Sequence, residues 1–520
     1  MFSNPEFVRN IRTQLTTGKM ITAVMIAAAL SLVIAFSLTH ISAPAAGPGG
    51  WGFMLLRGLF WIQALILAVG GGIACVNAIY KEKDQNTFDF QRVTRLSPLE
   101  LTLGKLFGAP IFLYFLCLCF VPLVIFSAVR GQQSFTFVLA AYAVLFIGSL
   151  TVHAFALLIS LLTVRGSHTA AIIFILVAVW FFANIFTLTS SYLFVGPLSP
   201  FYAAEVSTQR DWSSPASQGF AYLSPQATVY SNDAAKRDVF FGHPVLHFPV
   251  LFIIDALFIA WFLLALARNI KRDPTQYELY SPLQTFVLTI FINGILLAFV
   301  NWHIRLFDVQ ASLLTINMLV LSSLGLAQLR NRDRTRRILR SRKENIPSWL
   351  DFTWPAPFLF VAAITAGLLI SVSAAIAHHA ETEWSPAFAI FRCLFVAAWL
   401  VRDMQFLQWM MLQRGKRPLV MGVLYLSAFY ACVWIVLSSF GTFRDVDHLP
   451  FTAFFLPTPV YYLDHAAWTM RPAIWGGAFV AQFLMIAFFI YAQRKAILEL
   501  AHPPTAEAIP AAAIDATSPL

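Results

Sequence analysis

The sequence predicts an all-α fold, a polytopic bundle of transmembrane helices with about twelve spans. Hydrophobic residues make up 59% of the 520 positions and charged residues only 12%, whereas a soluble domain usually carries about 25% charged residues. The apolar runs continue for about twenty residues without the alternation of barrel strands. Because a backbone in lipid must satisfy its own hydrogen bonds, such runs are expected to form helices.

Runs of this length place the spans in two sets of six. They lie near residues 20–39, 55–78, 106–128, 135–163, 169–190, 245–267, 282–300, 309–329, 354–378, 386–403, 418–440 and 473–493.

Charge sets the orientation of these spans. With the amino end inside, 26 of the 35 lysine and arginine residues fall on the cytoplasmic side, Arg402 among them, as the positive-inside rule requires. We therefore expect an integral protein of the plasma membrane, the inner membrane in a bacterium, with both termini in the cytoplasm. Positive charge spread over one membrane face indicates contact with the lipid bilayer and no binding of nucleic acid.

The same pattern divides the chain into four regions. They are an amphipathic cytoplasmic connecting helix at 1–19, a six-span unit at 20–267, a second six-span unit at 268–493, and a disordered cytoplasmic tail at 494–520.

The head of the chain predicts a short amphipathic helix in the membrane interface. Asn4 is a good N-cap and Pro5 suits the first helical position. Phe7, Ile11 and Leu15 then recur at intervals of four residues, which places them on one helical face.

The loop between the second and third spans is the most informative segment. Ser97, Pro98 and Glu100 form a capping box with proline in the first turn, which starts the next helix abruptly. The preceding segment, 82–96, is predicted to form a short helix parallel to the membrane that exposes Phe88 and Phe90. A charged elbow with exposed aromatic side chains suits docking onto a soluble partner.

Here the sequence resembles the membrane subunits of type-2 ABC transporters, mostly exporters, over residues 1–267. Those permeases begin with an Asn-Pro-led connecting helix. They then carry a Glu-(basic)-Glu-x-Gly-Thr-x-Glu stretch, a Thr/Ser-Pro-Leu-Ser-type turn and a Gly-Lys pair at the third span. The matching positions are Glu82, Thr87, Leu96-Ser97-Pro98-Leu99 and Gly104-Lys105. The sequence departs from the family pattern at Asp84, Asn86, Asp89 and Arg95, and Asn86 stands where glycine is usual.

The resemblance implies that the elbow contacts a cytoplasmic ATPase subunit and transmits its closure. The docking residues would be Glu82, Thr87, Phe88, Phe90, Ser97, Pro98, Glu100, Gly104 and Lys105. An ordinary capped loop joining two spans is the alternative interpretation.

Nucleotide chemistry is expected on the partner. The chain has no Gly-x-x-x-x-Gly-Lys-Ser/Thr loop, so ATP and Mg²⁺ would bind to the separate ATPase. We expect this chain to be a transport subunit with no catalytic residues, no metal and no cofactor of its own. Its five cysteines all fall within apolar runs, where they are expected to pack between helices.

The second six spans repeat the layout of the first. One interpretation is a self-sufficient double permease of two parallel repeats, in which the Arg330–Lys343 run is the equivalent of the elbow. The other is a six-span permease with an unrelated extension that forms a homodimer. The basic run also suits anionic lipid headgroups without any ATPase.

Three of the ionisable residues inside predicted spans bear on function. Asp255 and Arg392 either line a transport pathway or form structural pairs, and His153 is expected to be a hydrogen-bonded packing residue. An ion-coupled secondary transporter is the alternative function, and an enzyme acting on lipid-linked substrates is a more distant one.

Overall fold

The computed structural model describes residues 4–41, 50–93, 95–162, 247–272, 279–298, 332–341, 386–413, 418–439 and 472–501, with short pieces between them. In these parts the chain is helical, which confirms the all-α class. The strands found there are two short ones, β1 (Val239–Phe240) and β2 (His243–Pro244), which pair antiparallel.

Among the described residues, seven helices are long and apolar enough to cross a membrane, which gives the chain the character of a helical membrane protein. They overlap the predicted spans at 20–39, 55–78, 106–128, 135–163, 245–267, 418–440 and 473–493.

The other five predicted spans are not among these seven helices. Those at 169–190 and 354–378 lie outside the described residues, and 309–329 is described only in fragments. The span at 282–300 is the shorter apolar helix α13 (Pro282–Ala298), and 386–403 is part of the more polar α18 (Pro386–Leu412). The total of twelve stays a prediction.

The chain divides into two compact units. Unit 1 comprises Met1–Leu279 with Ala298–Ile304, and unit 2 comprises Tyr280–Leu297 with Arg305–Leu520.

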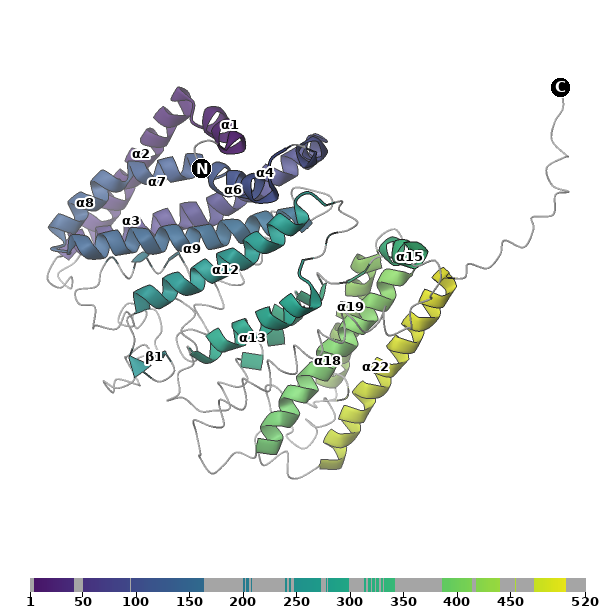
Figure 1. The fold of residues 1–520 in the computed structure, drawn as a ribbon. Coiled ribbons are helices and arrows are strands. Elements are labelled where there is room, and N and C mark those ends of the chain that lie inside the picture. Colours follow the sequence, from purple (N-terminus) through teal and green to yellow (C-terminus); the bar gives the residue numbers. More distant parts are fainter. Residues whose placement is uncertain are drawn as a thin grey trace, which may run out of the picture. The chain divides into compact units, whose positions relative to one another are not determined.

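Unit 1 is built around the second and fourth predicted spans (Figure 1). The second consists of α3 (Gly50–Leu65), η1 (Ile66–Gly71) and α4 (Gly72–Asp84), and the fourth is α9 (Phe135–Leu162). Against α9 pack α4 and α12 (His247–Asn269), while α2 (Thr17–Ile41) packs against α3.

The third predicted span forms three helical pieces, because proline cannot donate the backbone hydrogen bond that continues a helix. These are α6 (Pro98–Gly108), α7 (Ile111–Cys119) and α8 (Val121–Arg130), with Pro110 before α7 and Pro122 at the start of α8.

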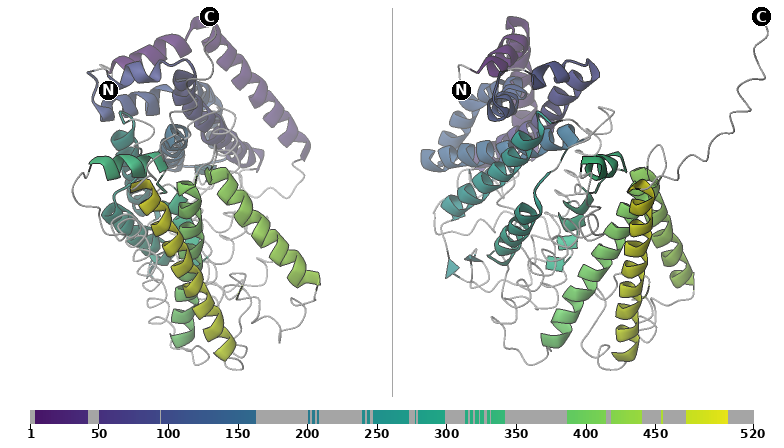
Figure 2. Two further views of the ribbon diagram at one scale, coloured as in Figure 1. Left: turned by 90° about the vertical axis from the view of Figure 1, so that its right-hand side faces the viewer. Right: turned by 45° about the vertical axis from the view of Figure 1, so that its right-hand side comes forward.

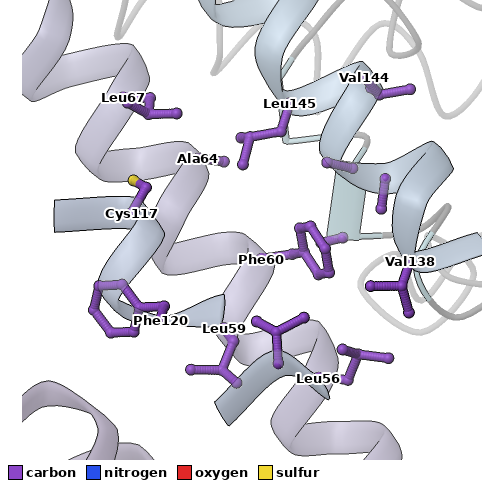
Figure 3. Packing of buried hydrophobic residues seen from close by; sticks show 14 of the residues in the cluster. Leu56, Leu59, Phe60, Ala64, Leu67, Cys117, Phe120, Val138, Val144 and Leu145 are labelled. Carbon is purple, nitrogen blue, oxygen red and sulfur yellow. The ribbon is translucent and has the colours of Figure 1, made fainter. Parts of the chain in front are cut away.

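The apolar core of unit 1 lies between these helices (Figure 3). Apolar side chains of α3 and η1 meet those of α9 and of the third span, and the central ones are almost fully buried, among them Leu56, Leu59, Phe60, Ala64, Leu67, Cys117, Phe120, Val138, Val144 and Leu145.

A π-helical turn interrupts the second span. Within η1, the Leu67 carbonyl accepts a hydrogen bond from Nε2 of His153 at 2.8 Å, and Nδ1 of the same ring lies 2.8 Å from Oη of Tyr114. π-Turns widen a helix and free carbonyl groups for such contacts. His153 is therefore the hydrogen-bonded packing residue that was predicted, and it joins three spans.

In unit 2, α18 packs against α19 (Pro418–Ser439) and α22 (Pro472–Ala501), and Figure 2 shows α22 in yellow alongside α18. Arg402 lies inside this group of helices with 3% of its surface exposed. Its Nη2 contacts Oδ1 of Asp403 at 2.6 Å, and its guanidinium stands 3.6 Å from the ring of Trp399. Helix α18 continues past Arg402 to Leu412, and Asp403 neutralises the charge. The predicted position of Arg402 on the cytoplasmic side stays a prediction.

Two further expectations about helix extent are corrected. The segment 82–96 is not one short helix, because α4 continues to Asp84 and the next helix, α5, covers only Phe88–Arg92. The expected tail at 494–520 begins as helix, since α22 extends to Ala501. The rest of that tail lies outside the described residues.

Candidate functional site

The predicted connecting helix is α1 (Pro5–Gln14). Oδ1 of Asn4 accepts hydrogen bonds from the backbone N–H groups of Glu6 at 3.0 Å and Phe7 at 3.4 Å, and Pro5 occupies the first turn. The predicted N-cap is confirmed. Phe7 is buried, whereas Arg12 on the other face is exposed. Ile11 and Leu15 are half-buried, so the predicted apolar stripe is the less exposed side of the helix.

The predicted capping box is present at the start of α6. Oγ of Ser97 accepts from the Glu100 N–H at 3.2 Å, and Oε2 of Glu100 accepts from the Ser97 N–H at 2.8 Å. Pro98 occupies the first turn. This arrangement fixes where the third span begins.

Helix α1 lies directly on α6. Nδ2 of Asn4 donates to the carbonyl of Glu100 at 2.6 Å. A Cβ atom at Gly104 would stand 2.8 Å from Cβ of Glu6, and one at Gly108 would stand 2.8 Å from Nδ2 of Asn10. Both glycines therefore allow a close approach that larger side chains would prevent.

A cluster of four charges joins these elements. Nη2 of Arg9 lies 2.7 Å from Oε1 of Glu6 and 2.7 Å from Oε1 of Glu82. Nζ of Lys105 lies 3.3 Å from Oε1 of Glu6 and also pairs with Glu82. Two carboxylates thus face two cations, which is the balance that buried charges require.

Burial makes this charge cluster sensitive to the loss of any member. The Lys105 side chain is 1% exposed and that of Glu82 is 10% exposed. Partial burial alone would lower the pKa of Arg9, but the hydrogen bond and charge of Glu82, together with Glu6, raise it above its ordinary value. Arg9 therefore remains charged. Gln91 adds a further bond, with Nε2 donating to Oε1 of Glu82 at 2.7 Å.

The turn between α4 and α5 positions the aromatic residues of the elbow. Asn86 has φ 54°, in the left-handed region where glycine is preferred and asparagine is the next most tolerant residue. The hydroxyl of Thr87 donates to the carbonyl of Glu82 at 3.3 Å, which closes the turn.

Phe88 does not face outward as predicted. It is 2% exposed, and its ring lies 4.8 Å from the Arg92 guanidinium and 5.9 Å from Nζ of Lys83. Lys83 also donates to the last carbonyls of α9, at 2.9 and 2.7 Å. Both cations lie over the ring, so Phe88 is a packing residue.

Three apolar side chains do face outward at the elbow. Phe90 is 73% exposed, as predicted, and Val93 and Leu99 are 78% and 52% exposed. We call these three residues the elbow surface. Val93 follows Phe90 by three residues, which is the spacing of one helical face, and this signal could have identified it from the sequence.

The two ionisable residues predicted as pathway lining belong to different units. Asp255, in α12, is 1% exposed; its Oδ1 accepts from the hydroxyl of Thr151 at 3.1 Å, and its Oδ2 has no hydrogen-bond partner in the described part of the chain. Arg392, in α18, is fully buried. Whether either lines a pathway stays a prediction.

In comparisons with known proteins, no family model, no curated protein and no solved structure matches the chain.

Proposed function

We propose that the chain is the membrane permease subunit of an ATP-driven ABC transporter, an exporter that works with a separate cytoplasmic ATPase. The observation that carries this proposal is the construction of the elbow. Its charge cluster joins the connecting helix to the ends of the second and third spans, and its surface presents Phe90, Val93 and Leu99.

This construction suits transmission of force. A partner that presses on the elbow surface moves α5, and Gln91 links α5 to Glu82 at the end of α4. Glu82 is in turn joined to Lys105 on α6 and to Arg9 on α1. A displacement at the elbow therefore reaches three elements that lead into the membrane.

The energy of transport comes from the partner. The ATPase binds the two conformations of the permease with different affinity, and its closure on ATP shifts the population toward the conformation that it prefers.

Turn geometry also supports the family resemblance, because the left-handed position at Asn86 falls where the family pattern has glycine.

The direct test is affinity purification in mild detergent with candidate ATPases co-expressed, scored by co-purification and ATP hydrolysis. We expect an ATPase dimer to be recovered with the chain. The mass of the complex distinguishes one chain per dimer, a double permease, from two chains, a homodimer. Recovery without any ATPase would favour the ion-coupled alternative, with Asp255 the first residue to test.

Substitution of the elbow surface is expected to weaken this complex without unfolding the chain. The variant Phe90→Ser with Val93→Ser removes two exposed apolar contacts. If both are central to the interface, each costs about 1–2 kcal/mol, or roughly tenfold in affinity. The midpoint of thermal unfolding should remain that of the parent.

The matched comparison is the variant Phe88→Ala, because the ring of Phe88 is buried in the same helix that carries Phe90. It should lower the thermal midpoint, since burial of a phenylalanine is typically worth about 3–5 kcal/mol. If the Phe90/Val93 variant retained the parent's full affinity for the ATPase, the elbow surface would not be the docking site.

A further inference from the structure

The basic run in unit 2 forms a helix held in place by packing. Helix α15 (Arg332–Ser341) buries Thr335 to 2% exposure, and its Leu339 packs against Leu412 of α18 and Ile497 of α22. Just before the helix, the N–H of Arg330 donates to Oε1 of Gln408 at 2.9 Å, and Nε2 of Gln408 donates back to the Arg330 carbonyl at 3.0 Å.

These contacts place α15 at one end of the helices of unit 2, as Figure 1 shows. Leu412 is the last residue of α18, and Ile497 lies in the last turns of α22. Helix α22 contains a segment long and apolar enough to cross a membrane. The natural position of α15 is therefore the boundary between the apolar and aqueous regions, where amphipathic helices lie.

Positive charge gathers at this end of unit 2. Helix α15 carries five arginines and one aspartate. Arg494 and Lys495, one turn before Ile497 on α22, are exposed. Arg336, on α15, is half-exposed.

The chemistry of α15 differs from that of the elbow in unit 1. The elbow balances its charges internally and presents apolar side chains. In α15, Leu339 packs against its neighbours, and the helix sequence holds five arginines and one aspartate. A surface of this kind, next to membrane helices, complements phosphate groups held in the membrane plane.

We propose that Arg336 of α15, with Arg494 and Lys495 of α22, binds the phosphate headgroups of anionic lipids. We call this set the basic belt. It is a lipid-binding surface and not a second ATPase-docking elbow, so it stands whether or not an ATPase partner is found.

The test uses the purified full chain in detergent and fluorescent phosphatidylglycerol as the probe, with phosphatidylcholine in a second titration. The variant is Arg336→Gln, Arg494→Gln and Lys495→Gln together. Each cation next to an anionic surface contributes roughly fivefold in binding, so the triple variant should bind phosphatidylglycerol on the order of 100-fold more weakly. Binding by the parent should also fall as salt rises.

The matched control removes the same charge from unit 1, where Arg12, Lys81 and Arg95 are exposed. Changing these three to glutamine should reduce binding far less. Three results would overturn the proposal: equal losses in variant and control, equal binding of phosphatidylcholine by the parent, or full competition by glycerol phosphate, which would indicate a site for free phosphate. Stronger binding of an acidic peptide than of phosphatidylglycerol would indicate a protein partner and overturn it as well.

Discussion

Lys105→Met is expected to destabilise the chain by about 3–5 kcal/mol, because it removes one partner of a buried ion cluster. The methionine fills the volume of the lysine stem, so the loss is mainly electrostatic. Glu6 and Glu82 would then face each other with only Arg9 to neutralise them, and the Arg9 side chain is 51% exposed. The measurement is the midpoint of thermal unfolding in mild detergent.

A second variant separates charge from packing. Adding Glu6→Gln to Lys105→Met leaves Glu82 paired with Arg9, so net charge in the cluster returns to zero and part of the lost stability should return. Lys81→Met, at an exposed position on α4, is the control and should change little. If Lys105→Met were as stable as this control, the cluster would not hold α1, α4 and α6 together.

Gly71→Ala is expected to have the second large effect, at the π-turn of the second span. A Cβ atom at this position would stand 2.1 Å from Nε2 of His153, so the ring must move away from the Leu67 carbonyl. Alanine normally stabilises a helix relative to glycine by about 1 kcal/mol. Here alanine should instead lower the free energy of unfolding by about 2–4 kcal/mol, because it overpacks the site and breaks a buried hydrogen bond.

The thermal midpoint of Gly71→Ala in detergent is compared with that of Gly476→Ala, where an added Cβ meets nothing within 4 Å. The double variant Gly71→Ala with His153→Ala should be less damaged than the sum of its single variants, because removing the ring removes the clash. Strict additivity would contradict the contact between Gly71 and His153.

Features that depend on neighbouring residues could be predicted from the sequence. The cap at Asn4 and the capping box of Ser97 and Glu100 follow from short-range hydrogen bonds between residues two or three positions apart. Seven of the predicted spans could also be read from local sequence, since the length and apolar character of a run decide whether a helix can cross a bilayer.

Features that depend on distant residues could not be predicted. Lys105 pairs with Glu6, 99 positions away, and His153 meets Leu67, 86 positions away. No local pattern distinguishes the buried Phe88 from the exposed Phe90, because the cations that cover Phe88 come from α4 and from the end of α5. The burial of Arg402 likewise depends on partners from three helices.

The central claim is that the elbow surface contacts an ATPase, and site-specific photo-crosslinking tests it most directly. A benzophenone amino acid replaces Phe90, which is 73% exposed, and the control replaces Tyr425 of α19, which is 55% exposed. Irradiation of cells that co-express the candidate ATPases should join position 90 to a protein with a nucleotide-binding loop, and position 425 should give no such adduct. The claim would be contradicted if position 90 gave no ATPase adduct, or gave no more than position 425.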